Sequence, residues 1–395
     1  MASDSTSRHG NPDNNLGPSA PWLAFGFLLT GLGTVLLGPL LPTLAHNWHL
    51  TDSQSGLLLL SKFIGAFIGG VTVPRRLRLG IFGGMALAFV GFGAFGLSHS
   101  LLSACIALFI SGIGVGQIIA STNILAGRRW RTHTGSALSS LNFFWSLGAV
   151  LTGLLVATLL PRFGLRNPLL CFAALFLLTG LGGLIRPISS THPKTEFATP
   201  DSTPLPLAPR IILVFALFLF LYGGLETCLT TWITTFQLRF STLRLLGGQS
   251  GVILLWASLT AGRAIASLLL RYLGEPLVQR IGLILSILFI ALLAIAHHGS
   301  SLSLCCVLLG LSLAPFFPTT FALLMRHQPS ARVAGFILAV SGLGAALFPW
   351  LMGVASTHFA SLRVAMAVPC ALAVLLLLLT LIRTETSVSQ ALASQ

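Results

Sequence analysis

Residues 211–237 read IILVFALFLFLYGGLETCLTTWITTFQ, an apolar run long enough to cross a bilayer that contains one acidic residue, Glu226. The other seven acidic residues of the chain fall in tails, loops or segment ends. An ionised side chain at mid-bilayer costs roughly 2.5–3.5 kcal/mol on insertion scales, so a residue that is kept there is a functional candidate by default. Glu226 is therefore the first candidate for a binding or coupling residue.

The composition predicts a polytopic membrane protein. Hydrophobic residues make up 54% of the chain and charged residues 8%, whereas a soluble domain has about 25% charged residues. The six cysteines show no metal-ligand spacing, which argues against a zinc site or a disulfide framework. We expect no cofactor and no metal, apart from a coupling proton or sodium ion.

The formal net charge of +14 does not indicate nucleic-acid binding, because the arginines lie in short clusters between apolar runs. This is the pattern of topological signals in membrane proteins. Residues 1–20 are polar, show no cleavable signal peptide and are predicted to form a disordered cytoplasmic tail. We expect the partners to be the lipid bilayer and a small-molecule substrate, with no nucleic acid, and we expect a monomer.

Hydropathy predicts an all-α membrane protein with twelve transmembrane helices, since backbone polar groups in lipid must be satisfied within the chain. The expected spans are 21–45, 54–73, 80–97, 102–125, 135–160, 168–186, 211–237, 249–271, 281–297, 302–325, 333–356 and 364–383. The segment 187–210 is rich in Pro, Ser and Thr and is predicted to link two bundles of six helices, 21–186 and 211–383. Residues 384–395 form a second predicted cytoplasmic tail.

Lysine and arginine counts predict the orientation. With the N-terminus inside, fifteen of these residues fall on the cytoplasmic side and five on the outer side. Positive residues concentrate on the cytoplasmic side of membrane proteins. Both termini are therefore expected in the cytoplasm, and a bacterial cytoplasmic (inner) membrane is the expected location.

The two halves show the signs of a repeat. The segments beginning at Ser55-Gly56 and Ser250-Gly251 match at an offset of 195, Gly148 and Gly344 at 196, and Gly112 and Gly310 at 198. Because six spans separate the copies, both copies have the same orientation, so the bundles are predicted to be pseudo-symmetric. Parallel repeats of this kind are typical of transporters with a substrate site between the halves near mid-membrane.

Two basic residues join Glu226 inside the expected spans: Lys62 in the second and Arg263 in the eighth. One hypothesis is that Lys62 and Glu226 form an ion pair or proton site that switches between the halves, since an opposite charge lowers the cost of burial. The alternative is a static structural pair, or a Lys62 that extends to the membrane interface. Arg263 is interpreted as a gate or helix-packing residue.

Uncharged polar and aromatic residues form a second candidate set. Amides bind hydroxyl groups well because they offer both donors and acceptors, and an indole offers a flat apolar face with one donor. The candidate substrate contacts are Gln117, Asn123, Asn142, Trp145, Trp232 and Trp256. Polar side chains within apolar helices also hold helices together, so packing is the alternative for each of them.

Proline and glycine mark bends and close contacts. Pro39, Pro42, Pro315, Pro318 and Pro349 are expected to bend their helices, because proline lacks a backbone donor. Close helix approach is expected at Gly65, Gly69, Gly70, Gly112, Gly114, Gly116, Gly342 and Gly344. Enzyme classes are disfavoured, since no histidine lies mid-span and no nucleotide-binding lysine motif is present.

The loop Gly70-Val71-Thr72-Val73-Pro74-Arg75-Arg76-Leu77-Arg78 resembles the G-x-x-x-D-R-x-G-R loop between spans 2 and 3 of the major facilitator superfamily. Gly70, Arg75 and Arg78 match the pattern, while Pro74 and Leu77 stand in place of the acid and the second glycine. The resemblance covers nearly the whole chain. It implies the major facilitator fold and a role for Arg75 and Arg78 in the inner gate.

Further motifs resemble the fucose permease-like group of sugar:cation symporters, which includes relatives of sodium-dependent glucose transporters. The stretch from Tyr222 to Glu226 with Trp232-Ile233 is similar to that group's Y-x-G-x-E…W-I pattern. The resemblance implies that Tyr222 and Glu226 contact the substrate. Carboxylates expected in spans 1 and 4 of that group are absent here.

The main hypothesis is a secondary transporter that moves a small hydroxylated solute, most simply a monosaccharide, by alternating access with cation coupling. The first alternative is an exporter of amphipathic compounds such as drugs or lysolipids on the same fold. The second alternative is a receptor or scaffold that transports nothing. Solute flux and its competition by stereoisomers would separate these hypotheses.

Overall fold

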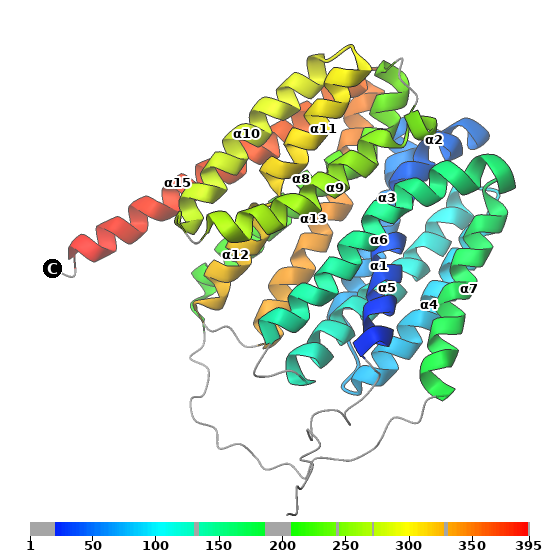
Figure 1. The fold of residues 1–395 in the computed structure, drawn as a ribbon, viewed down its shortest axis with the longest axis horizontal. Helices are drawn as coiled ribbons and strands as arrows, with labels where there is room; N and C mark the ends of the chain where they lie inside the picture. Colours follow the sequence, from blue (N-terminus) through cyan, green and yellow to red (C-terminus); the bar gives the residue numbers. More distant parts are fainter. Residues whose placement is uncertain are drawn as a thin grey trace, which may run out of the picture.

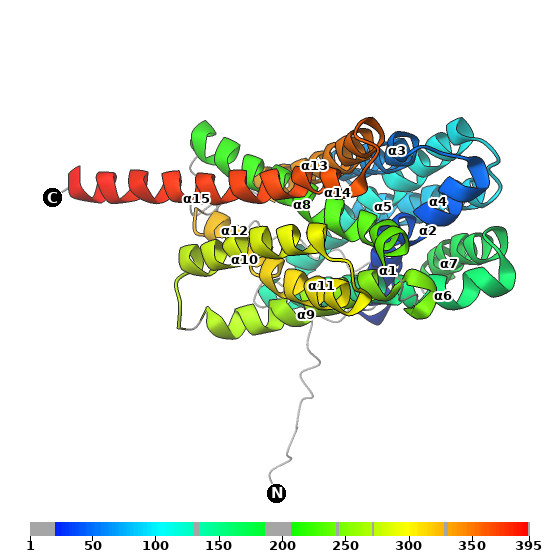
Figure 2. The same cartoon turned by 90° about the horizontal axis from the view of Figure 1, so that it is seen from above.

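Two groups of antiparallel helices lie side by side (Figures 1 and 2). The computed structural model describes residues 20–129, 134–185, 207–241, 245–270, 272–327 and 331–393. The first group comprises α1 (Ala20–Val35), α2 (Leu37–Trp48), α3 (Asp52–Val71), α4 (Leu77–Gly96), α5 (Leu101–Arg129), α6 (Thr134–Phe163) and α7 (Arg166–Ile185). The second comprises α8 (Pro209–Phe240), a 3-10 turn (Leu245–Gly248), α9 (Ser250–Leu269), α10 (Glu275–Ile295), α11 (Gly299–Leu313), α12 (Phe316–Met325), α13 (Ala331–His358), α14 (Leu362–Ala365) and α15 (Ala367–Ala393).

The helices match the predicted spans in number and order. Within the described residues, eleven helices are long and apolar enough to cross a membrane, and Ser250–Ala266 is a shorter apolar helix that corresponds to the eighth predicted span. The predicted all-α class is thereby confirmed. Helix α15 continues past residue 383, the predicted end of the last span. Residues 1–19 of the predicted tail and 187–206 of the predicted linker lie outside the described part of the chain.

Prolines interrupt two of the spans. Between α1 and α2, Leu36 keeps helical backbone angles, and Pro39 has no N–H to donate to the carbonyl four residues earlier. The tenth span breaks at Ala314 and Pro315, between α11 and α12. Pro349 lies within α13 without ending that helix, so the bend expected there does not interrupt it.

Glycines allow equivalent helix pairs to cross closely in both groups. An added Cβ on Gly148 would lie 2.2 Å from the Leu28 carbonyl oxygen, and one on Gly344 would lie 1.8 Å from that of Phe220. These positions are two of the repeat anchors, and they place α6 on α1 and α13 on α8 in the same way. The backbones meet directly, because no side chain separates them.

The third pair of anchors behaves alike. An added Cβ on Gly112 would lie 2.1 Å from the Lys62 carbonyl oxygen, which places α5 on α3, and one on Gly310 would lie 2.6 Å from that of Leu255, which places α11 on α9. Close contacts are likewise found at Gly65, Gly69, Gly114 and Gly116. The expectation is wrong for Gly70 and Gly342, where an added Cβ would meet its nearest neighbour at an ordinary 3.9 Å.

The two groups converge at one end and spread apart at the other (Figure 1). We call the end where α7 ends and α8 begins the linker end, and the opposite end the far end. At the far end, an added Cβ on Gly56 of α3 would lie 2.9 Å from Trp350 of α13, and one on Gly353 would lie 2.4 Å from the Asp52 carbonyl oxygen. The backbones of the two groups therefore touch at the far end.

A cluster of polar side chains, the far-end clasp, reinforces this contact. The Asp52 carboxylate at the start of α3 accepts two hydrogen bonds from Arg239 at the end of α8, at 2.6 and 2.5 Å. It accepts a third from Ser356 of α13 at 2.5 Å. Asp52 is thus held by two helices of the other group, and the forked Arg–carboxylate geometry is the strongest form of this interaction.

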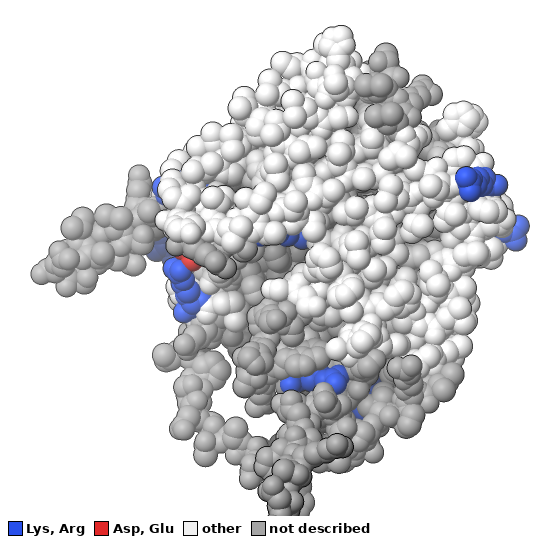
Figure 3. All heavy atoms as spheres, in the orientation of Figure 1, with Lys and Arg blue, Asp and Glu red and all other residues white. Residues whose placement is uncertain are grey.

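The surface suits a lipid environment. Figure 3 shows that Lys, Arg, Asp and Glu cover little of the visible face; most of them lie toward its edges, and a few basic atoms show in a hollow near its middle. Large apolar side chains such as Leu178, Leu213 and Ile295 are more than half exposed. Apolar surface of this extent on a single chain is consistent with contact with lipid.

Candidate functional site

The candidate site is a cavity of about 190 Å³ between the two helix groups near the middle of the molecule. Both groups contribute to it, which is the arrangement predicted from the repeat. Its walls are formed by Thr34, Val35, Phe63 and Trp145 from the first group and by Tyr222, Gly223, Glu226, Thr227, Thr230, Thr231, Trp256, Phe317, Ser341, Gly342 and Ala345 from the second. Apolar walls with few polar groups are typical of small-molecule sites.

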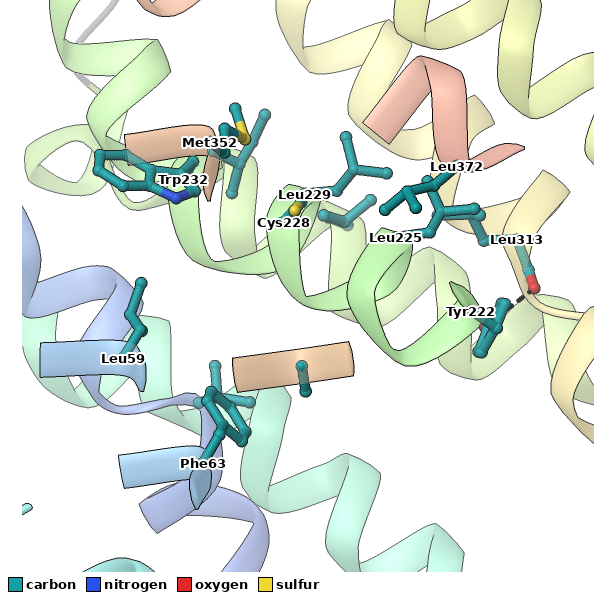
Figure 4. Packing of buried hydrophobic residues seen from close by; sticks show 14 of the residues in the cluster. Leu59, Phe63, Tyr222, Leu225, Cys228, Leu229, Trp232, Leu313, Met352 and Leu372 are labelled. Atoms are coloured by element: carbon teal, nitrogen blue, oxygen red, sulfur yellow. Dashed lines mark hydrogen bonds between the residues drawn. The ribbon is translucent and has the colours of Figure 1, made fainter. Parts of the chain in front are cut away.

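The period of α8 explains how Glu226 reaches this cavity. Residues four apart lie on one face of a helix, so Tyr222, Glu226 and Thr230 form a row along the cavity wall. Leu225 and Leu229 project from another side of α8 into the core of the second group (Figure 4). Burial of that apolar side fixes the orientation of α8 about its own axis. Glu226, on a different side of the helix, therefore faces the space between the groups.

Glu226 forms an ion pair with Arg263 of α9. The Arg263 Nη2 atom lies 3.6 Å from Glu226 Oε1, and the two side chains are 25% and 15% exposed. The other terminal nitrogen of Arg263, Nη1, donates to the Ser146 hydroxyl of α6 at 3.1 Å. Arg263 therefore connects the acid of the second group to a hydroxyl of the first group, across the boundary between them.

Two donors beside the cavity are unused. The Arg263 Nε atom and the Trp256 Nε1 atom are buried without a hydrogen-bond partner. Trp256 also packs edge-on against Trp145 of the other group, with ring centroids 5.4 Å apart. Buried donors without partners cost about 1–3 kcal/mol each, so the site is more stable when a bound molecule or water accepts from them.

Lys62 does not pair with Glu226 in this structure. Its ammonium group donates to the Thr34 carbonyl oxygen at 2.6 Å, and it lies 5.4 Å from the centre of the Phe63 ring. Lys62 is 2% exposed. The hypothesis of a Lys62–Glu226 pair is therefore wrong for this state. The orientation of α3 places Lys62 beside the end of α1, and Arg263 is the partner of Glu226.

Replacing Lys62 with methionine should raise the apparent melting temperature by a few degrees. The substitution keeps the apolar stem but removes a buried charge that is bonded to a carbonyl rather than to an acid, and such charges are costly to bury. Thermal unfolding of the purified protein measures the change. A clear loss of stability would instead show that the ammonium group holds α1 and α3 together.

Four of the predicted substrate residues line the cavity: Trp145, Tyr222, Glu226 and Trp256. Trp232 does not, because its indole donates to the Pro349 carbonyl oxygen at 3.0 Å and its side chain is 1% exposed. It lines instead a separate cavity of about 150 Å³ beside the far-end clasp. Of the three predicted tryptophans, Trp145 and Trp256 therefore line the central cavity, and Trp232 lines the cavity beside the clasp.

The predicted amides do not line the central cavity. Gln117 and Asn123 lie on α5 and are partly buried, and Asn142 lies on α6 and is exposed. The Asn123 Oδ1 atom is buried without a hydrogen-bond partner. Helix α5 packs within the first group against α3 and α4.

Sequence reasoning missed several cavity residues. Phe63 of α3, Phe317 of α12 and Ser341 of α13 line the site, but an apolar residue in an apolar span gives no signal of its own. Phe317 is the exception, because it lies between Pro315 and Pro318, two of the prolines at which a bend was expected. These prolines were the available signal, since each removes a backbone hydrogen bond of its helix.

The predicted gate arginines lie at the linker end. Arg75 lies in the turn between α3 and α4 and Arg78 in the first turn of α4; both are exposed. Neither forms one of the ion pairs found among the described residues. The gating role of Arg75 and Arg78 stays a prediction.

The fold and a cavity between two six-span groups define a membrane transporter. The family profile described as Major Facilitator Superfamily matches residues 23–337, so the chain belongs to that superfamily. Members of this superfamily are transporters and not enzymes.

Relatives and solved structures agree with this family. The 4-hydroxybenzoate transporter PcaK of Acinetobacter baylyi is 30% identical over 39% of this chain and 34% of its own length. The multidrug efflux protein YfmO of Bacillus subtilis is 26% identical over 87% of each chain. The transporter FucP in its outward conformation has a TM-score of 0.63 at 17% identity, over 92% of this chain and 98% of its own; another solved structure of FucP is titled as the E. coli fucose:proton symporter. A bacterial homolog of the lysosomal transporter Spinster, inward-facing, has a TM-score of 0.73 at 13% identity, over 93% of this chain and 96% of its own.

Coverage of the relatives is uneven. The chain spans about a third to a half of the length of the first four curated relatives that it matches. The structural matches have less than 25% identity and show the fold. These similarities establish the class of protein, and its substrate is a separate question.

Proposed function

We propose that this protein is a secondary transporter that carries a small cyclic organic solute across the bacterial inner membrane by alternating access, with a coupling cation. The observation that carries the proposal is the Glu226–Arg263 pair at an aromatic cavity to which both helix groups contribute. The groups 21–186 and 211–383 are the moving units, and Glu226 is the coupling residue.

The direction in which the cavity opens follows from the contacts between the groups. Backbone contacts and the far-end clasp close the far end. The predicted orientation places the linker end in the cytoplasm, because fifteen basic residues lie on that side. On this basis the structure is an inward-facing state of the transporter.

Two classes of solute fit the site. A monosaccharide is supported by the motif resemblance and by the flat faces of Trp145 and Trp256. A small organic acid is supported by Arg263 and by the similarity to a 4-hydroxybenzoate transporter. Export of amphipathic compounds is a further candidate, favoured by the similarity to a multidrug efflux protein along most of the chain.

Counterflow in proteoliposomes tests the proposal. Vesicles containing the purified protein are loaded with an unlabelled solute, and entry of the same labelled solute is followed for monosaccharides, aromatic acids and cationic dyes. We expect saturable entry of one class that its own analogues compete with. A protein that moves none of these classes above empty vesicles would contradict the proposed function.

Replacing Asp52 with asparagine should shift the protein toward a state that is open at the far end. The substitution removes the negative charge and one of the two acceptor oxygens of the far-end clasp, in which Arg239 is 42% exposed. Because the pair is partly solvated, we expect about 1 kcal/mol, or about a fivefold change in the ratio of the two states. Electron paramagnetic resonance distances between labels at His99 and His298, at the far ends of the two groups, measure this shift.

The matched control is Glu275→Gln. Glu275 pairs with Arg326 within the second group, so its loss leaves the contacts between the groups intact. We expect the label distances of that variant to equal those of the wild type. Label distances in Asp52→Asn that equal those of the wild type would show that the backbone contacts alone close the far end.

A further inference from the structure

The cavity beside the far-end clasp is built by both helix groups. Its volume is about 150 Å³; α2 and α3 of the first group supply part of its wall, and the last turns of α8 in the second group supply the rest. Arg239, which lines it, is 42% exposed, so the cavity borders the medium at the far end. When the groups separate at that end, these walls separate as well. The cavity therefore belongs to the state that is closed at the far end.

Two hydroxyl groups of this cavity, one from each helix group, are unused. Ser55 of α3 is 1% exposed and Thr235 of α8 is 6% exposed. Both residues line the cavity, and within the described part of the chain neither hydroxyl oxygen has a hydrogen-bond partner. A hydroxyl group can donate one hydrogen bond and accept two, and a buried polar group without a partner destabilises the protein. The cavity therefore presents two groups that a bound molecule would satisfy.

The charged residues of the cavity neutralise each other. The Asp52 carboxylate accepts hydrogen bonds from Arg239 at 2.6 and 2.5 Å and from Ser356 at 2.5 Å. A carboxylate has about four acceptor positions, so about one stays open to a further donor. Because one charge of each sign lies in direct contact, the cavity favours neither a cation nor an anion.

The rest of the wall is apolar and sets the size of the occupant. It includes Leu41, Pro42, Leu238 and Trp232. The Trp232 N–H is donated to the Pro349 carbonyl oxygen, so this side chain offers the cavity carbon surface and no free donor. An apolar cavity of about 150 Å³ accommodates benzene, a molecule of about six heavy atoms. The matching ligand is therefore a neutral molecule of about that size that combines carbon atoms with several hydroxyl groups.

We propose that this cavity is a regulatory site for a small neutral polyol of about three carbons, such as glycerol, which holds the far end closed. The polyol hydroxyl groups bond with Ser55, Thr235 and the open acceptor position of Asp52, and so connect α3 with α8. A ligand that binds one of two states shifts the equilibrium toward that state. Bound polyol therefore slows opening at the far end without competing for the central cavity, a consequence that rests on the proposed alternating access.

Saturation-transfer NMR of glycerol with the purified full-length protein tests this site. The wild type should bind glycerol saturably with a dissociation constant of about 1–10 mM, since so few heavy atoms limit the affinity. Thr235→Val keeps the shape but removes the hydroxyl group, and should weaken binding about tenfold, the effect of one lost hydrogen bond. Thr158→Val is the matched control, because it removes an exposed hydroxyl that bonds within α6, and it should bind like the wild type. Mannitol, a polyol of twice the size, should not compete.

Gly353→Ala tests the link between the site and the closed far end. An added Cβ there would lie 2.4 Å from the Asp52 carbonyl oxygen of the other group, whereas the residue itself lies on α13, which does not line the cavity. The variant should lengthen the distance between labels at His99 and His298 and weaken glycerol binding at least about tenfold. Gly335→Ala, on the same helix with nothing within 4 Å of the added Cβ, should match the wild type in both measurements.

Four results would overturn the inference. They are the absence of saturable glycerol binding to the wild type, which would mean that the cavity holds water only, wild-type affinity in Thr235→Val, wild-type affinity in Gly353→Ala, and competition by mannitol equal to that of glycerol. The NMR measurement requires no flux. Loss of the polyol site would therefore leave the transporter standing, and absence of counterflow would leave the polyol site standing.

Discussion

Arg263→Gln should lower the rate of counterflow about a hundredfold. Arg263 is the partner of Glu226 and the contact to Ser146 across the two groups, and removing one member of a buried pair costs about 3–5 kcal/mol. Because both side chains are partly exposed, we take the lower end of that range, about 3 kcal/mol; a loss of this size in the slowest step of the transport cycle corresponds to a factor of about 150 in rate. Initial rates in proteoliposomes measure the loss.

Two further variants separate transport from folding. Arg326→Gln removes an arginine whose acid partner lies on the surface, so its rate should stay within about twofold of the wild type. The double variant Arg263→Gln, Glu226→Gln removes both charges and should recover the wild-type melting temperature while the rate stays low. Recovery of transport in the double variant would show that the pair serves only the fold.

Gly344→Ala should prevent accumulation of folded protein. The added Cβ would lie 1.8 Å from the Phe220 carbonyl oxygen, so α13 and α8 would have to move apart along their contact. Overpacking costs typically 1–3 kcal/mol and more where backbone blocks the new atom, so we expect a loss of at least about 3 kcal/mol. The fraction of monodisperse protein after extraction in detergent measures the effect.

Gly335→Ala is the matched control on the same helix. An added Cβ on Gly335 meets nothing within 4 Å, and alanine is favoured over glycine within a helix by about 1 kcal/mol. The yield of this variant should equal or exceed that of the wild type. A normal yield of Gly344→Ala would mean that α8 and α13 separate more easily than their packing indicates.

The number and order of the helices could be predicted because lipid imposes one rule on every span, a run of about 20 apolar residues. Glu226 could be identified for the same reason, since an acid is conspicuous in such a run. The crossing at Gly344 was also expected, and the repeat aligns this glycine with Gly148. These features depend on local sequence or on the comparison of one half with the other.

The partner of Glu226 could not be predicted, because the choice between Lys62 and Arg263 depends on how α3 and α9 are rotated in their bundles. That rotation follows from packing between helices, such as the contact of Gly112 with the Lys62 backbone. Helical periodicity is weak in spans that are apolar on every side. For the same reason the sequence could not show that Asn142 is exposed and that Phe63 lines the cavity.

Because Arg239 is exposed, the strength of the far-end clasp depends on the salt concentration of the medium on that side of the membrane. Salt screens the attraction between solvent-exposed charges, with a screening length of about 10 Å at 0.1 M and about 3 Å at 1 M. The backbone contacts beside the clasp, at Gly56 and Gly353, carry no net charge and respond little to salt. In a saline medium facing the far end, the balance therefore moves toward the state open to that medium, while the same salt on the other side leaves the clasp unchanged.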